Sequence, residues 1–297
     1  MLKNPVMTAS GTFGYGLEFA DFMPLDGIGG IIVKGTTLKP REGNDYPRMA
    51  ETASGMLNCV GLQNKGVDYF CEHIYPQIKD IDTHMIVNVS GSSPEDYAEC
   101  AARIDALERI PAIELNISCP HAMDGYGASI GQDCNLSHKI VSASKDAAKI
   151  PIIAKLTPNV TDITEIAKTC EEAGADALSL INTLGPGMKI NIDVARPVLF
   201  HKSGGMSGRA IKPIAISNVY SVYEAVDIPL IGVGGIYTFE DVVEFIFAGA
   251  RAVQIGTAIM DEGVTVFDDI NKGLEKFMAE KGYSSIDEMV GIAHREL

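Results

Sequence analysis

The sequence contains no run of 18 or more apolar residues, so it predicts no membrane-spanning helix. Its first ten residues, MLKNPVMTAS, also lack the apolar core of a signal peptide. Basic residues are scarce: 24 Lys and Arg stand against 39 Asp and Glu, which gives a net charge of -15. A surface of that sign repels nucleic-acid phosphates and anionic membranes. We therefore expect a cytoplasmic protein that binds neither nucleic acid nor membrane.

The six cysteines show no metal-ligand spacing. No two of them form a C-x-x-C pair, and they do not cluster as the ligands of zinc or iron–sulfur centres do. Disulfides are not expected in a reducing compartment. The default role of any one of these cysteines is that of a small buried side chain, and no metal site is predicted.

Eight short apolar runs rich in Val and Ile recur along the 297 residues, and each is typical of a strand buried on both faces. Helical patterns lie between most of them, including one capped by Ser93, one that begins at Asp162 and one capped by Thr238. The expected strands are 5–9, 30–34, 85–89, 112–117, 152–156, 177–181, 230–233 and 252–255.

Alternation of strands and helices predicts a parallel sheet with right-handed crossovers. Eight strands in about 250 residues are typical of an α/β fold of the (β/α)8 TIM-barrel type, here as a single domain over residues 1–297. The alternative is an open doubly wound sheet, but no G-x-G-x-x-G joins the first strand to a helix. We expect extended loops after strands 2, 4 and 6; the connections 35–84 and 182–229 are long enough to be functional.

Polar residues and glycines stand where the expected strands end. In a barrel of this kind the carboxyl ends of the strands surround the active site. One polar strand end is weak evidence, because strand ends meet water in any fold, whereas the full set predicts one lined pocket. The set comprises Ser10, Gly11, Lys34, Asn88, Ser90, Asn116, Ser118, Cys119, Lys155, Asn182, Thr183, Gly234, Gly235, Gly256 and Thr257.

These residue types indicate a planar cofactor that carries a phosphate. Lys34 and Lys155 each end an apolar run, where a lone ammonium is costly unless it meets an anion. Asn88, Asn116 and Asn182 offer donors and acceptors to an amide-rich heterocycle. Glycines after the last two strands expose backbone N–H groups where this fold commonly binds phosphate. FMN fits this pattern, with Lys155 as the cation that stabilises the reduced flavin.

Cys119 is the catalytic candidate. It lies in LNISCPHAMDGYGASIGQD, which leaves the fourth expected strand and enters a glycine-rich loop. A thiol there could take a proton as a general base, although the pKa of a free thiol, about 8.5, would need tuning by its surroundings. Inert packing is the alternative role for Cys119. His121 is a rival base, but it is more simply interpreted as a loop histidine.

With these residues identified, the chain resembles class 1 dihydroorotate dehydrogenases, and most closely their B subclass. The similarity runs from Asn4 to about Ala258. GLQN and the cysteine in NISCP are typical of the B subclass. Two departures, Cys59 in the GMLNCVGLQN stretch and Arg209 in place of a common proline, remove no reacting group. The matching stretches are NPVMTASGTFGYG, VKGTTLKPREGN, GMLNCVGLQNKG, NVSG, LNISCP, AKLTPNV, INTLGPG, GGMSGRAIKP, GVGGI and QIGTA.

The resemblance implies a barrel that holds FMN and oxidises (S)-dihydroorotate to orotate in the pathway to UMP. Cys119 would take the C5 proton while N5 of FMN accepts the C6 hydride. The substrate would be held by Lys34, Asn58, Cys59, Val60, Gly61, Leu62, Asn116, Asn182 and Thr183. FMN would contact Ser10, Lys34, Gly35, Asn88, Asn116, Lys155, Ile181, Gly208, Gly234, Gly235, Gly256 and Thr257.

The resemblance also implies a partner. B-subclass enzymes pass electrons to NAD through a second subunit that carries FAD and a [2Fe-2S] cluster. This sequence has neither a cysteine set for such a cluster nor a dinucleotide fingerprint. We therefore expect the catalytic subunit of a heterotetramer built on its own homodimer, with fumarate or a quinone as alternative acceptors.

Two other functions compete with this interpretation. The stretch SCPHAMDGYG with GQD is also similar to the pyrimidine-reducing domain of dihydropyrimidine dehydrogenase, an FMN barrel that reduces uracil or thymine, but that family lacks the GMLN and GLQN loop. A flavin-free barrel acting on phosphate metabolites would account for the terminal glycines and Lys155. It would not need NISCP together with three strand-end asparagines.

Overall fold

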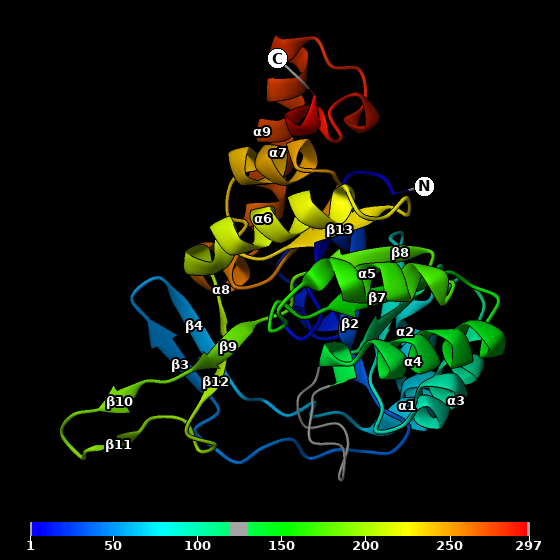
Figure 1. Ribbon diagram of the computed structural model, residues 1–297, viewed down its shortest axis with the longest axis vertical. Coiled ribbons are helices and arrows are strands. Elements are labelled where there is room, and N and C mark those ends of the chain that lie inside the picture. Colours follow the sequence, from blue (N-terminus) through cyan, green and yellow to red (C-terminus); the bar gives the residue numbers. More distant parts are fainter. Residues whose placement is uncertain (1, 119–129, 296–297) are drawn as a thin grey trace.

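A closed barrel of eight parallel strands stands at the centre of the computed structural model, which describes residues 2–118 and 130–295 (Figure 1). The strands follow one another around the barrel in chain order, and the last pairs with the first. The predicted (β/α)8 barrel is confirmed and the open sheet is excluded. The barrel strands are β1 (Val6–Thr8), β2 (Gly30–Thr36), β5 (Met85–Val89), β6 (Ile113–Asn116), β7 (Ile152–Leu156), β8 (Ala177–Leu180), β13 (Leu230–Val233) and β14 (Ala250–Ile255).

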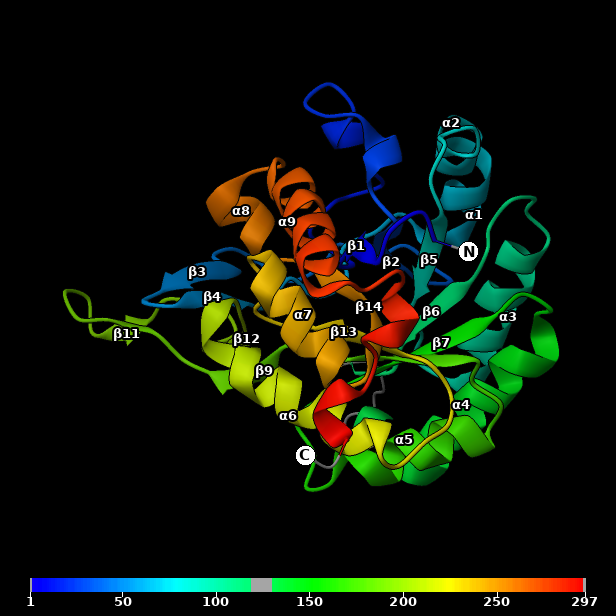
Figure 2. The same ribbon diagram turned by 90° about the horizontal axis from the view of Figure 1, so that it is seen from above.

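Helices surround the strands, as Figure 2 shows from above. Three expected caps are confirmed: the side chains of Ser93, Asp162 and Thr238 each accept a hydrogen bond from a backbone N–H of the first turn. No helix in the described ranges is both long and apolar enough to cross a bilayer. The helices are α1 (Gly66–Tyr69), α2 (Tyr75–Ile78), α3 (Pro94–Asp105), α4 (Cys134–Ala147), α5 (Ile163–Glu172), α6 (Lys212–Tyr223), α7 (Phe239–Phe247), α8 (Ala258–Glu262) and α9 (Val266–Lys281).

The barrel interior is built in layers, because alternate side chains of a strand point to the same face. One layer is an apolar cluster: Met7, Ile32, Ile86, Ala112, Ile153, Ile231 and Ala252. A second set of inward positions lies two residues beyond four members of this layer and two residues beyond Ala177, which is partly buried and packs against it. We call this set, Asn88, Glu114, Lys155, Ser179 and Gln254, the polar layer; all five side chains are buried. The sequence therefore changes from apolar to polar toward the carboxyl ends of the strands.

The two long connections form a second sheet at that end of the barrel. Strands β3 (Met49–Thr52) and β4 (Gly55–Asn58) come from the first connection, and β9 (Leu184–Gly187) and β12 (Gly204–Ser207) from the second. They pair in the order β3-β4-β12-β9, and we call them the mouth sheet (Figure 1). Ser207 accepts a hydrogen bond from Thr257, just beyond β14, at 2.8 Å. The expected loops are therefore partly an antiparallel sheet.

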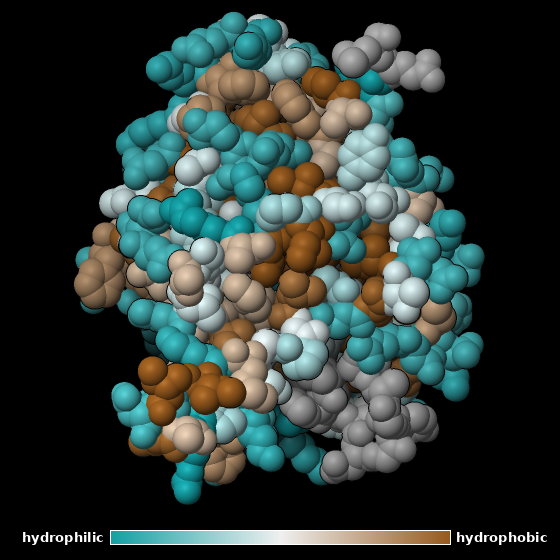
Figure 3. Space-filling model, turned by 60° about the vertical axis from the view of Figure 1, so that its left-hand side comes forward, coloured by the Kyte–Doolittle hydropathy of each residue, from teal (hydrophilic) through white to brown (hydrophobic). Residues whose placement is uncertain are grey.

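A hairpin of β10 (Ile190–Asn191) and β11 (Arg196–Pro197) projects beyond the mouth sheet (Figure 1). Its apolar side chains are largely exposed, and Figure 3 shows apolar side chains gathered at the lower left of the face that includes this end of the molecule. Such a patch is typical of a surface that another protein covers. The exposed residues are Met188, Ile190, Ile192 and Val194.

Candidate active site

The polar layer is one hydrogen-bonded network centred on Glu114, whose side chain is fully buried. Oε1 accepts from Asn88 Nδ2 at 2.7 Å and from Lys155 Nζ at 3.5 Å. Oε2 accepts from Ser179 Oγ at 2.9 Å and from Gln254 Nε2 at 2.5 Å. The network joins side chains from five strands, so it depends on closure of the barrel.

Glu114, Ser179 and Gln254 were not among the predicted site residues. A signal was present in the run IELNI: period-2 alternation places Glu114 on the same face as Asn116, two residues later. An acidic residue inside a buried strand is costly unless it is paired. The same spacing places Gln254 two residues beyond the apolar Ala252.

Lys155 occupies the position expected of a cation inside the mouth. Its ammonium is buried, donates to Gln254 Oε1 at 2.9 Å and pairs with Glu114. Lys155 was expected to meet an anion, and its role toward a ligand stays a prediction. The anion that it meets within the described residues is a side chain of the barrel itself.

Asn88 provides a test of whether a cofactor fits. Its amide nitrogen donates a hydrogen bond to Glu114, whereas its Oδ1 is buried and has no hydrogen-bond partner within the described part of the chain. A buried acceptor without a donor costs about 1–3 kcal/mol. Gly35 lies beside it, and a Cβ there would stand 3.2 Å from that oxygen. A planar ligand with an N–H or O–H donor fits this position, as a flavin does.

The structure brings Asn116 and Asn182, two of the predicted strand-end residues, into direct contact. Asn182 Nδ2 donates to Asn116 Oδ1 at 3.3 Å and also to Ser118 Oγ. Ser118 Oγ donates to Asn116 Oδ1 at 2.7 Å. Thr183 N donates to Asn182 Oδ1 at 2.8 Å. The carboxyl ends of β6 and β8 thus present one amide-rich surface.

Two residues missed by the sequence analysis support these groups. Tyr97 OH donates to the carbonyl of Asn116 at 2.7 Å, from helix α3. Asn159 donates to the carbonyl of Thr183 at 3.2 Å and accepts from Gly185 N at 2.9 Å. Both fix the backbone beside the amides. Neither follows an apolar run directly, so no strand-end signal identified them.

The segment expected to hold the substrate, Asn58 to Leu62, begins at the last residue of β4 and is tied to the end of β2. Asn64 links the two segments by hydrogen bonds. Its Nδ2 donates to the Leu62 carbonyl at 2.8 Å, and its Oδ1 accepts from Thr37 N at 3.2 Å. Asn44 donates to the Cys59 carbonyl at 2.8 Å and to the Val60 carbonyl through its backbone N at 2.9 Å. Gly61, with φ 81°, needs the left-handed conformation open to glycine.

Lys34 and Ser10 lie next to each other in the barrel, on β2 and just after β1. Ser10 Oγ donates to the Val33 carbonyl at 3.2 Å. The Lys34 ammonium lies 5.8 Å from the centre of the Tyr15 ring and is only partly buried. This cation is therefore available to an anionic ligand.

The expected phosphate residues gather where β13 and β14 end. Gly234 and Gly235 have φ values of 127° and 75°. A Cβ on Gly235 would lie 2.9 Å from the Gly208 carbonyl oxygen, so the two loops touch through backbone atoms. Ile181 N bonds the Val233 carbonyl at 2.9 Å. Gly256 directly precedes Thr257, whose hydroxyl contacts the mouth sheet. Backbone N–H groups in glycine turns of this kind can bind a phosphate.

Arg209 is held beside this end by two side chains. Its guanidinium lies 3.7 Å from the centre of the Tyr237 ring and pairs with Glu262 at 2.7 Å. Burial, together with the hydrogen bond from Tyr237 to Asp261, raises the pKa of Tyr237. The phenol therefore stays neutral across the physiological range.

The predicted catalytic residue, Cys119, lies outside the described residues, as does its rival His121. The strand that leads to them ends at Asn116, and Ser118 is the last described residue before them. The role of Cys119 stays a prediction.

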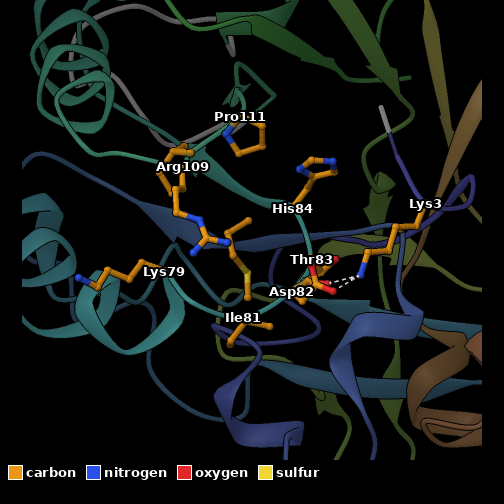
Figure 4. A pocket seen from close by; sticks show the side chains of 11 residues that line it. Lys3, Lys79, Ile81, Asp82, Thr83, His84, Arg109 and Pro111 are labelled. Carbon is orange, nitrogen blue, oxygen red and sulfur yellow. Dashed lines mark hydrogen bonds and ion pairs between the residues drawn. The ribbon is translucent and has the colours of Figure 1, made fainter.

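A cavity of about 360 Å³ lies at the other end of the barrel (Figure 4). Its lining includes Gly29, His84 and Pro111, which precede β2, β5 and β6. Lys3 and Asp82 within it form an ion pair at 2.8 Å. None of the strand-end amides reaches this cavity, so it is separate from the candidate active site.

Comparison with known proteins gives consistent matches. The family described as "Dihydroorotate dehydrogenase" matches residues 1–278. A protein of Bacteroides thetaiotaomicron named "Dihydroorotate dehydrogenase B (NAD(+)), catalytic subunit" is 58% identical over 98% of this chain and 95% of its own length. A protein of the same name from Methanothermobacter thermautotrophicus is 53% identical over 99% of this chain and 95% of its own. A protein of the same name from Desulforamulus reducens is 50% identical over 98% of this chain and 95% of its own length.

Proposed function

The chain belongs to the dihydroorotate dehydrogenase family, and from that premise we propose that it oxidises (S)-dihydroorotate to orotate in pyrimidine biosynthesis. The observation that carries the proposal is the amide-lined mouth, in which Asn116 and Asn182 meet and Asn88 keeps a buried acceptor unpaired. The family is flavin-dependent. The relatives described above carry the dihydroorotate dehydrogenase name, so the pyrimidine-reducing alternative is not favoured.

We propose FMN as the flavin. When bound, it supplies the atom that accepts the hydride from C6 of dihydroorotate. The residues of this chain would hold its ring and phosphate. The support for this assignment is the unpaired Asn88 oxygen, the buried Lys155 cation and the positive-φ glycines beyond β13. The proposed contacts are Ser10, Lys34, Gly35, Asn88, Asn116, Lys155, Ile181, Gly208, Gly234, Gly235, Gly256 and Thr257.

The substrate is an anion with several amide groups, and the proposed contacts match that chemistry. Lys34 would bind its carboxylate, since this ammonium is partly exposed. The Asn116 and Asn182 amides would orient the ring, and Thr183 with residues 58–62 would close over it. Asn64 and Asn44 would hold that loop in place beside the substrate.

Cys119 would accept the proton that leaves C5. A thiolate base becomes a neutral thiol when it takes that proton. The substrate loses a hydride from C6 and a proton from C5, and a C5–C6 double bond forms. General bases of this kind contribute about 10²–10⁴-fold in rate. Cys119→Ser, argued in the Discussion, tests this role.

The names of the relatives, "NAD(+), catalytic subunit", point to a separate partner subunit. We propose that the partner carries FAD and a [2Fe-2S] cluster and passes electrons to NAD, and that two copies of this chain form the centre of a heterotetramer. Support comes from the exposed apolar hairpin residues, which are typical of a surface that a second protein covers. Free thiols at the described cysteines fit a cytoplasmic location.

The decisive experiment is anaerobic addition of dihydroorotate to the purified protein while flavin absorbance is followed. Rapid bleaching would support the flavin, the substrate and the half-reaction together. A yellow protein that does not bleach would contradict the substrate, and a colourless one that cannot be reloaded with FMN would contradict the cofactor. Co-purification from the native host tests the partner: a homodimer alone with full NAD-linked activity would refute the heterotetramer.

A further inference from the structure

We propose that Glu114 is a positioning residue that sets the redox preference of the flavin site through Lys155 and Asn88. The inference rests on the proposed function, because it concerns the same pocket. Glu114 is not among the proposed contacts of substrate or cofactor. It lies in the polar layer, two residues before Asn116 on β6.

The side chain of Glu114 is a buried carboxylate with its charge balanced locally. Its two oxygens receive four hydrogen bonds, from Asn88, Lys155, Ser179 and Gln254. All four partners act as donors, so both oxygens of Glu114 serve as acceptors in these contacts.

Glu114 fixes the place of the Lys155 ammonium. Lys155 Nζ donates to Gln254 Oε1 at 2.9 Å, and Gln254 Nε2 donates in turn to Glu114 at 2.5 Å. Lys155 Nζ also contacts Glu114 directly, at 3.5 Å from Oε1, so the three side chains contact one another. Because the Gln254 amide nitrogen donates to the carboxylate, its oxygen faces Lys155 and accepts from the ammonium. Glu114 therefore sets the orientation of the amide that holds the cation.

Glu114 also decides which end of the Asn88 amide is left for a ligand. Because Nδ2 donates to Glu114 Oε1 at 2.7 Å, Oδ1 must point elsewhere, and it is the atom without a partner. A neutral glutamine at position 114 could present its own N–H and let the amide of Asn88 reverse. The acceptor offered to the flavin would then become a donor.

Charge arithmetic gives the expected redox effect. The ion pair of Glu114 with Lys155 sums to zero, so the site is less positive than the lysine alone would make it. Removal of the carboxylate charge leaves the ammonium unbalanced in a region of low dielectric. Reduced flavin carries more negative charge than oxidised flavin, so Glu114→Gln should favour the reduced form.

The test compares the affinities of the apoprotein for oxidised and for reduced FMN. We expect Glu114→Gln to change their ratio at least tenfold in favour of reduced FMN, which is about +30 mV for a two-electron couple. Lys155→Met should change it in the opposite direction. Ser179→Ala is the matched control: it removes one neutral donor from the same carboxylate and should stay within threefold of the parent.

The outcomes separate this inference from the proposed function. If the parent binds FMN and bleaches but Glu114→Gln changes the ratio less than threefold, or toward oxidised FMN, the role of Glu114 is refuted and the function stands. If the parent binds no FMN, the proposed function fails instead. Should Glu114→Gln not fold, Glu114→Met answers the same question, because it removes the same charge next to Lys155 without adding an N–H group. It should also favour reduced FMN at least tenfold, and a change of less than threefold, or toward oxidised FMN, refutes the role of Glu114.

Discussion

Asn182 Nδ2 lies 3.3 Å from Asn116 Oδ1, although 66 residues separate them in the chain. The contact exists because only β7 lies between β6 and β8 in the barrel, so the carboxyl ends of these two parallel strands lie close together. It aligns two amides of a kind that recognise a pyrimidine ring by hydrogen bonds. This relationship gives the first prediction.

Asn182→Ala should weaken the binding of dihydroorotate and orotate by about tenfold to a hundredfold, because a hydrogen bond to a charged ligand contributes about 1.5–3 kcal/mol. FMN retention should change little. The measurement is the orotate dissociation constant from the perturbed flavin spectrum, beside KM. Asn218→Ala, on the exposed face of α6, is the control. An unchanged dissociation constant would remove Asn182 from the substrate site.

Cys119→Ser should retain FMN but slow flavin reduction by about 10²–10⁴-fold near neutral pH. A serine hydroxyl is a far weaker base than a thiolate, so part of the rate should return at high pH. Stopped-flow reduction by dihydroorotate across pH measures this. Cys134→Ser, at a half-buried position at the start of α4, is the control that should reduce normally. Equal rates for both variants would show that Cys119 is not the base.

Gly235→Ala should reduce both stability and FMN binding. The residue has φ 75°, and a Cβ there would lie 2.7 Å from Lys212 Cβ and 2.9 Å from the Gly208 carbonyl oxygen. Strain of this backbone type costs about 1–3 kcal/mol, to which the steric clash adds.

Gly11→Ala is the matched control for Gly235→Ala. Its φ is 86°, but a Cβ there meets no atom within 4 Å. The two variants share backbone strain and differ in crowding. Urea unfolding and FMN titration of both should show the larger loss at position 235, and equal losses would contradict a close approach of the two loops.

Stability should fall as pH rises from 9 to 12. Burial raises the pKa of the Cys100 thiol and of the Cys170 thiol from 9.0 to about 12. Below pH 9 both folded and unfolded chains keep these protons, so the contribution is fully present. Above it the unfolded chain releases them first, and the free energy of unfolding falls by about 1.4 kcal/mol per pH unit for each thiol.

Cys170→Ala tests this origin of alkaline instability. Removal of the thiol should make the free energy of unfolding fall less steeply between pH 9 and 11. This holds whether or not the substitution also changes the free energy of unfolding at pH 8. Val141→Ala, a buried truncation in α4 with no titrating group, should keep the parent slope while lowering stability. Urea unfolding at several pH values measures both slopes. A parent-like slope in Cys170→Ala would assign the decline to other groups.

Much of the fold could be predicted because its signals are local. Short apolar runs define buried strands, and Ser93, Asp162 and Thr238 mark helix starts through bonds made within their own first turn. The count of strands and their alternation with helices then leave few topologies. The strand-end residues could be predicted for the same reason, because each of them directly follows its own apolar run in the sequence.

The sequence by itself therefore determined the barrel, the identity of the amides and lysines at its mouth, and the family they resemble. Only the tertiary structure decided that residues 55–58 and 204–207 pair in the mouth sheet, and that Glu114 joins Asn88, Lys155, Ser179 and Gln254. The physical reason is that these contacts connect segments distant in the chain. Their formation depends on the register of strands that only a closed barrel fixes.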